Sequence, residues 1–166
     1  YDKVVMAMSE ILKEVPEAKY ILGGDGDDKS RIEAIVNEHG LQDKVIFTGF
    51  IPDKEAAEYY NLCDVFVMPS SGEGFGVVFL EALACGKPVI AGNLDGSREP
   101  LLDGKLGLLI NPWDLNQITE AIVKVLKGNV DSRLLDVNFL RQGVIENFGL
   151  ERFKERVSES LTYINS

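Results

Sequence analysis

The chain contains little of what metal sites, disulfide frameworks and nucleic-acid surfaces are made from. Its 166 residues include one histidine and two cysteines, and 17 lysines and arginines stand against 27 aspartates and glutamates. One histidine and two separated cysteines do not supply the ligands of a zinc site, so we expect no metal. The net charge of −10 disfavours nonspecific binding of nucleic acid, whose phosphates attract a basic surface.

Long apolar runs are also missing. None reaches the roughly 18 residues that a membrane-spanning helix needs, and the polar start Tyr1-Asp2-Lys3 shows no signal peptide. Cys63 and Cys85 lie in apolar segments, which favours buried thiols in a reducing compartment over a disulfide. We therefore expect a cytoplasmic protein, and its hydrophobic fraction of 45% is enough for the core of one domain spanning residues 1–166.

Short apolar runs alternate with helical patterns along most of the chain. Strands are expected at residues 18–22, 44–48, 64–68, 88–91 and 107–110. Helices are expected at residues 1–14, 29–38, 53–62, 77–86 and 114–126, with Asp53 and Asp114 as caps of two of them. This order predicts an α/β fold with one parallel sheet that is covered by helices on both faces. Residues 131–147 and 150–164 are predicted to form a helical tail packed on the outside.

Four glycine-rich segments follow predicted strands, at residues 23–26, 49–52, 69–76 and 92–96. Ligands of parallel sheets bind beyond the carboxyl ends of the strands, so we expect the site there. The third segment ends in Gly72-Glu73-Gly74-Phe75-Gly76 and leads into a helix. Its glycines let the backbone approach a ligand closely, and the N–H groups at the helix start suit a pyrophosphate. The first segment, Gly23-Gly24-Asp25-Gly26, is not a full dinucleotide fingerprint and is also compatible with a plain turn.

Glu73 and Glu81 lie eight positions apart, with only glycines and apolar residues between them. Glu81 falls on a helix that we expect to be buried on all sides, where an unpaired carboxylate would be unfavourable by several kcal/mol. We interpret Glu81 as a ligand for ribose hydroxyls or another polar group, and both carboxylates can reach one elongated ligand. The alternative is that the glycines only turn the chain and Glu81 pairs with a neighbouring arginine or lysine.

The run from Pro69 to Gly76, continued from Glu81 to Ala91, resembles the signature of the retaining GT-B glycosyltransferases of glycosyltransferase family 4. Residues 21–26, 45–51 and 95–109 resemble further segments of that family in the same order. The resemblance implies a Rossmann-like parallel sheet, the C-terminal, nucleotide-sugar-binding half of a GT-B fold. It also implies that the chain lacks the first strand, with two phosphate-binding cations, and the N-terminal acceptor-binding domain.

The resemblance also implies roles for particular residues. Glu73 would hold hydroxyls of the donor sugar and favour the positive charge that develops at its anomeric carbon, and Glu81 would hold the ribose hydroxyls. The remaining substrate-binding residues lie in the glycine-rich segments. They are Gly24 in the first turn, Phe50 and Ile51 against the base, and the backbone of Gly74, Phe75, Gly76 and Val77 at the phosphate and sugar.

The implied reaction is transfer of a sugar from a UDP- or GDP-linked donor to a hydroxyl acceptor, without metal or cofactor. The isolated domain would be inactive. A membrane-lipid acceptor would be bound through the N-terminal domain, at the inner face of the cell membrane. Two alternatives remain open: a nucleotide-sugar epimerase-like enzyme and a noncatalytic nucleotide-binding module.

Overall fold

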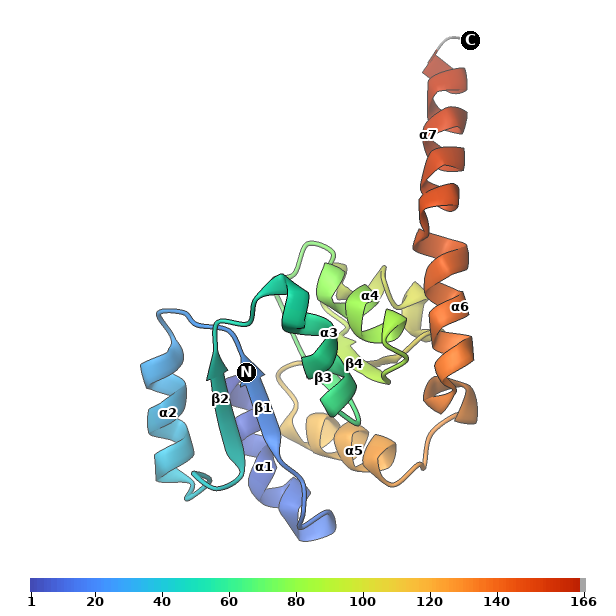
Figure 1. The fold of residues 1–166 in the computed structure, drawn as a ribbon. Helices are drawn as coiled ribbons and strands as arrows, with labels where there is room; N and C mark the ends of the chain where they lie inside the picture. Colours follow the sequence, from blue (N-terminus) through green and yellow to red (C-terminus); the bar gives the residue numbers. More distant parts are fainter. Residues whose placement is uncertain (165–166) are drawn as a thin grey trace.

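The computed structural model describes the backbone of residues 1–164 and the side chains of residues 1–158, and it confirms the predicted α/β class (Figure 1). The strands are β1 (Tyr20–Gly23), β2 (Val45–Gly49), β3 (Phe66–Met68), β4 (Val89–Gly92) and β5 (Leu108–Ile110). The helices are α1 (Asp2–Glu14), α2 (Lys29–Glu38), α3 (Asp53–Leu62), α4 (Val77–Ala84), α5 (Leu115–Leu126), α6 (Val137–Phe148) and α7 (Leu150–Ile164). Three short 3-10 helices are η1 (Gly96–Arg98), η2 (Leu102–Gly104) and η3 (Ser132–Leu135).

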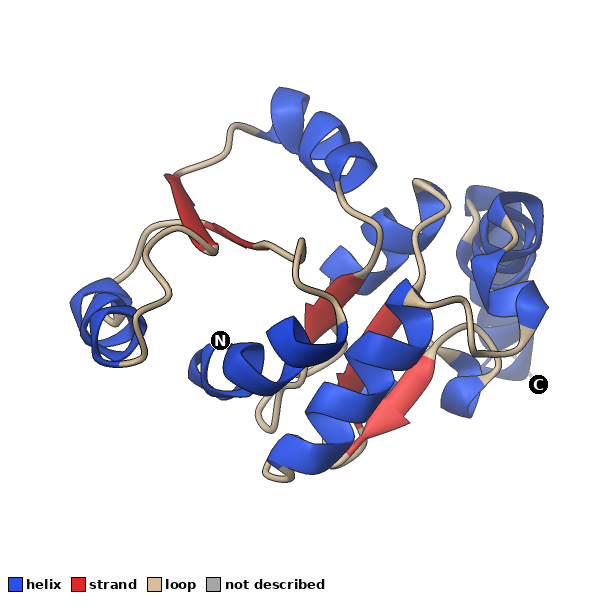
Figure 2. Cartoon of the chain, turned by 90° about the horizontal axis from the view of Figure 1, so that it is seen from below, coloured by secondary structure: helices blue, strands red, loops and turns tan. Residues whose placement is uncertain are grey.

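The strands are parallel, as predicted, but among the described residues they form two sheets where the sequence predicted a single one. Strands β1 and β2 make one pair, in which Tyr20 lies opposite Val45. The other sheet has the order β3-β4-β5, with Phe66 opposite Val89 and Ile90 opposite Leu108. The two groups of strands lie apart in Figure 2. The sequence pattern identifies the strands but does not say which strand lies beside which.

One hydrophobic core nevertheless joins the two sheets. It contains Val5 and Ile11 of α1, Leu22 of β1, Ile90 of β4 and Ile118 of α5, each less than a tenth exposed. A second cluster forms where α4 and α6 pack on β4, and Phe79, Leu83 and Leu140 are fully buried there. The shared core makes the two sheets parts of one structural unit, because separating them would expose apolar surface to water.

Local sequence signals explain most helix ends. The Asp114 carboxylate accepts hydrogen bonds from two N–H groups in the first turn of α5, as predicted. The prediction that Asp53 caps α3 is wrong, because Pro52 occupies the N-cap and Asp53 is the first helical residue. At that position the negative charge of Asp53 interacts favourably with the helix dipole. Gly86, with φ of +73°, ends α4. Its N–H donates to the Leu83 carbonyl, and the next N–H donates to the Ala82 carbonyl, a Schellman motif.

The C-terminal tail differs from its prediction in two ways. The expected helix at residues 131–147 is divided into η3 and α6, because Asp136 turns the chain and caps α6. Helix α6 packs against α4 on the outside, as predicted. Helix α7 instead rises away from the rest of the chain in Figure 1, and Leu150 and Phe153 are 66% and 62% exposed on it.

Candidate active site

Helix α4 is buried on one face only, so the expectation of an apolar helix buried on all sides is wrong. Phe79, Ala82 and Leu83 are buried, whereas Val77 is 61% exposed and Glu81 is also exposed. Val77 and Glu81 are four positions apart and therefore share one face of the helix. The Glu81 carboxylate is exposed to water, so burial is not a reason to expect a ligand bound to it. Glu81 is instead a carboxylate available at the surface.

Glu81 is held by a tyrosine, and not by the arginine or lysine of the alternative interpretation. The Tyr60 hydroxyl, on α3, donates a hydrogen bond to Glu81 Oε2 over 2.8 Å. Burial and the hydrogen bond to the Glu81 carboxylate both raise the pKa of Tyr60 well above its usual range. The phenol therefore stays protonated, and remains a donor, at any physiological pH.

The loop that carries Glu73 is fixed by the segment after β4. The Glu73 N–H donates to Asp95 Oδ2 over 2.7 Å, and the Gly96 N–H donates to the Glu73 carbonyl over 2.9 Å. A Cβ atom on Gly96 would lie 2.0 Å from the Gly74 carbonyl oxygen, so only glycine fits there. We call this contact, formed by Asp95 and Gly96 with Glu73 and Gly74, the loop clamp.

The Asp95 carboxylate is also bound by the Ser97 N–H over 3.0 Å. Partial burial raises the pKa of Asp95, but the hydrogen bonds from Glu73 and Ser97 outweigh it and hold the pKa below its usual range. Sequence reasoning placed Asp95 and Gly96 in a family-like loop without giving them a role. The available signal was an Asp-Gly pair that begins three residues after the end of a buried strand.

The Glu73 carboxylate is half-buried, and its Oε1 accepts only a local hydrogen bond from the Gly74 N–H among the described residues. Gly76 then leads into α4 as its N-cap, with φ of +84°. A Cβ atom on Gly76 would lie 2.4 Å from the Phe79 ring, so a side chain has no room there. The Phe79 N–H donates to the Gly76 carbonyl over 3.0 Å, whereas the N–H groups of Val77 and Val78 before it have no acceptor within the helix. The loop and the helix start therefore form a surface suited to an anion.

Gly24 follows the end of β1, and Phe50 and Ile51 follow the end of its partner strand β2. The Gly24 N–H donates to the Gly49 carbonyl over 2.9 Å, and Ile51 packs over Gly23. Phe50 is 76% exposed, so its ring is free to stack on a flat partner.

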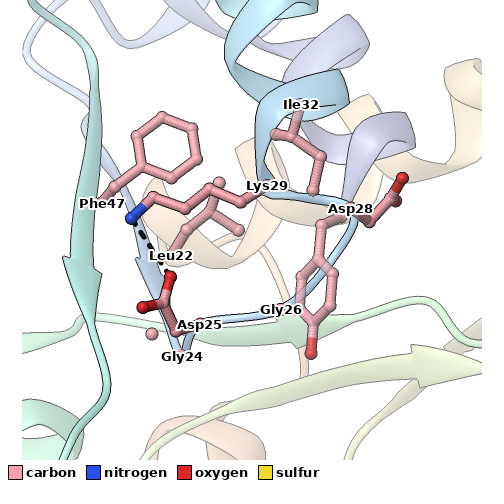
Figure 3. Close-up of a pocket in the computed structure, with 10 residues that line it drawn as sticks. Leu22, Gly24, Asp25, Gly26, Asp28, Lys29, Ile32 and Phe47 are labelled. Carbon is pink, nitrogen blue, oxygen red and sulfur yellow. Dashed lines mark hydrogen bonds and ion pairs between the residues drawn. The ribbon is translucent and has the colours of Figure 1, made fainter.

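A pocket of about 170 Å³ opens beside Gly24 (Figure 3). Lys29 and Asp25 form an ion pair of 3.1 Å at its edge. The pocket is lined by Tyr1, Leu22, Gly23, Gly24, Asp25, Gly26, Asp28, Lys29, Ile32 and Phe47. Glu73 and Glu81 are not among them, so this pocket covers only the Gly24 side of the predicted site.

The predicted residues thus form two groups at the carboxyl ends of parallel strands. Gly24, Phe50 and Ile51 make one group, and the Glu73 loop with α4 makes the other. Helix α3 connects them, because it begins at Asp53, two residues after Ile51, and its Tyr60 binds Glu81.

The described residues hold neither a metal-binding cluster nor a membrane-spanning helix. Among the side chains that the structure describes, those of residues 1–158, no cluster of three or more His, Cys, Asp or Glu is arranged to hold a metal ion. None of the described helices combines the length and apolar character needed to cross a membrane. Cys63 and Cys85 are free thiols and half-buried, not buried as expected.

Comparison with known proteins agrees with this geometry. The family described as glycosyl transferases group 1 matches residues 1–137. The GDP-mannose-dependent alpha-(1-6)-phosphatidylinositol monomannoside mannosyltransferase of Mycolicibacterium smegmatis is 35% identical over 132 residues, covering 75% of this chain and 35% of that enzyme. The chain spans about a third of the length of the curated relatives that it matches.

Solved structures show the same fold. Sucrose-phosphate synthase from Thermosynechococcus elongatus superposes with a TM-score of 0.82 at 30% identity, over 99% of this chain and 42% of that one. The pneumococcal O-GlcNAc transferase in complex with UDP and GlcNAc gives 0.76 at 26%, over 96% and 33%. The C-terminal domain of a group 1 glycosyl transferase from Francisella tularensis gives 0.75 at 27%, over 90% and 79%.

The fold and its loops define an α/β domain of the kind that binds ligands beyond the carboxyl ends of its strands. The chain belongs to the glycosyl transferases group 1 family.

Proposed function

We propose that this chain is the donor-binding, C-terminal part of a retaining glycosyltransferase that transfers a sugar from a UDP- or GDP-linked donor to a hydroxyl acceptor. The observation that carries the proposal is the fixed Glu73 loop at the start of α4, with Glu81 on the exposed face of the same helix. Glu81 stands four residues into α4, about 6 Å along its axis, and its side chain points back toward the helix start. Two carboxylates therefore flank one anion-binding surface.

Each residue then has a distinct task. The N–H groups at the start of α4 and the backbone of Gly74, Phe75, Gly76 and Val77 bind the diphosphate and the sugar, and stabilise the leaving charge. Glu73 binds sugar hydroxyls and favours the positive charge at the anomeric carbon as the bond to the diphosphate breaks. Glu81 accepts hydrogen bonds from the ribose, and Gly24, Phe50 and Ile51 border the base.

The choice of donor is supported by relatives and not by a contact in this chain. The mycobacterial relative is named as GDP-mannose-dependent, and the pneumococcal structure contains UDP and GlcNAc. The same relative acts on a phosphatidylinositol mannoside, which supports a lipid acceptor bound by an N-terminal domain, at the inner face of the cell membrane. We propose a cytoplasmic enzyme that needs neither metal nor cofactor.

A further strand between β1 and β3 belongs to this proposal. Among the described residues β1 pairs only with β2, and β3 pairs only with β4. Tyr1 lies between the carboxyl ends of these two strands, because it lines the pocket beside Gly24 while its hydroxyl lies 4.0 Å from Met68 Sδ. A strand leading into Tyr1 would run parallel to both neighbours, and α1 would form the crossover to β1. We propose that the preceding part of the whole protein supplies this strand, its phosphate-binding cations and the acceptor domain, so that the isolated domain is inactive.

The test is Glu73→Ala in the complete protein, assayed for sugar transfer from UDP- and GDP-linked donors. We expect transfer to be lost while the thermal unfolding curve stays close to that of the wild type, because the clamp binds Glu73 through its backbone. Unchanged transfer would rule out the role given to Glu73. Conversion of the nucleotide sugar to an epimer without an acceptor would favour an isomerase, and binding without any turnover would favour a noncatalytic module.

A further inference from the structure

The hydrogen bond between Tyr60 and Glu81 has no place in the proposed reaction so far. It joins two elements that are adjacent in space: α3, which follows the base-side residues Phe50 and Ile51, and α4, which carries the proposed ribose-binding carboxylate. We infer that Tyr60 is a positioning residue that holds the Glu81 carboxylate ready for the ribose hydroxyls, and thereby favours ribonucleotides over deoxyribonucleotides. This inference rests on the proposed function.

The position of the Tyr60 hydroxyl is set by the aromatic packing around its ring. The Tyr60 ring meets the Phe66 ring edge-on, with centroids 5.5 Å apart, and Phe66 meets Phe79 in the same manner at 5.9 Å. Phe79 is fully buried, and its ring also fills the space beside Gly76. A hydroxyl anchored in this way has little freedom to move. The same aromatic packing therefore fixes the position of the Glu81 carboxylate and the conformation of the turn that begins α4.

The chemistry leaves Glu81 able to bind a ligand while Tyr60 holds it. A carboxylate offers about four lone-pair positions on its two oxygens. Tyr60 uses one of them, on Oε2, so Oε1 and the rest of Oε2 remain for two adjacent hydroxyls. Without Tyr60, an exposed glutamate would lose its rotamer freedom only when the nucleotide binds, which weakens binding. Restraining the carboxylate beforehand avoids most of that loss.

The experiment uses Tyr60→Phe in the complete protein, because this change removes the hydroxyl and keeps the ring packing. Calorimetric titration compares the nucleoside diphosphate that the wild type binds with its 2′-deoxy counterpart. We expect affinity for the ribonucleotide to fall about tenfold, roughly the effect of one restrained side chain, and affinity for the deoxynucleotide to change little. In a Glu81→Ala background, Tyr60→Phe should cause no further loss.

Tyr59→Phe is the matched control, because Tyr59 is the preceding residue on α3 and no hydrogen bond joins its hydroxyl to Glu81 within the described residues. It should leave both affinities unchanged. Equal losses for the two nucleotides, or no loss for either, would overturn the role of Tyr60 even though Glu81→Ala weakens ribonucleotide binding. If Glu81→Ala itself has no effect, or if the wild type binds no nucleotide, the proposed function fails first and the inference fails with it.

Discussion

Gly96→Ala should move the Glu73 loop without removing any functional side chain. In the structure a Cβ atom on Gly96 would lie 2.0 Å from the Gly74 oxygen, 2.5 Å from the Gly74 carbonyl carbon and 2.8 Å from the Glu73 oxygen. All three atoms belong to the backbone, so rotation of a side chain cannot relieve the contact. An ordinary contact of at least 3.4 Å requires the Glu73–Gly74 backbone to retreat by more than 1 Å.

Such a displacement changes the direction of the Glu73 carboxylate relative to α4. A misplacement of about 1 Å in a catalytic group can reduce the rate by about 100-fold, and we expect a loss of that order in kcat. The effect on folding should be smaller, about 1 kcal/mol, because the main loss is the hydrogen bond from the Gly96 N–H to the Glu73 carbonyl.

The assay measures kcat for sugar transfer and the free energy of unfolding in urea, both on the complete protein. Gly26→Ala is the control, since a Cβ atom there would meet nothing within 4 Å, and it should lose far less activity. If Gly96→Ala keeps the wild-type kcat in a folded protein, the loop clamp does not position Glu73 and the reasoning is refuted.

Two further predictions concern the clamp and the sheets. The pKa of Asp95 is lowered in the folded state, so its ionised form stabilises the fold above the ordinary aspartate pKa, and that contribution is lost as the pH falls through the lowered value. We therefore expect Asp95→Asn to be less stable than the wild type at pH 7 and the difference in Tm to shrink on acidification toward about pH 3; a constant difference would contradict the linkage. The N–H groups of Tyr20 and Phe66 point toward β2 and β4. The next N–H group of each strand, that of Ile21 or Val67, points the other way, toward the proposed strand. In the complete protein, the amide hydrogens of Ile21 and Val67 should therefore exchange slowly. Fast exchange at both positions would rule that strand out.

Local sequence signals predicted the helices and strands well, because the residues that begin and end such an element lie within or next to it. The cap at Asp114 and the glycine end of α4 at Gly86 are examples, and both are confirmed. The prediction of Asp53 as an N-cap was wrong because the extended backbone of the N-cap lies one residue earlier, at Pro52. The exposed face of α4 was missed because an apolar run from Val77 to Ala84 shows no contrast except Glu81.

Contacts between residues far apart in the chain could not be predicted from the sequence. Tyr60 and Glu81 are 21 positions apart, and Glu73 and Asp95 are 22 apart, so no local spacing points to either pair. The split into two sheets was also hidden, because strand order depends on packing in three dimensions. The glycine-rich segments could be predicted as the site because the carboxyl ends of parallel strands meet at one edge. Their division into a Gly24–Ile51 group and a Glu73–Glu81 group needed the structure.

The most direct test of the central claim is a calorimetric titration of the complete protein with UDP, GDP and ADP in the presence of EDTA. Our account predicts saturable binding of UDP or GDP, weakened by Glu81→Ala, without any metal. Binding of neither nucleotide by a protein shown to be folded would contradict the proposed donor site.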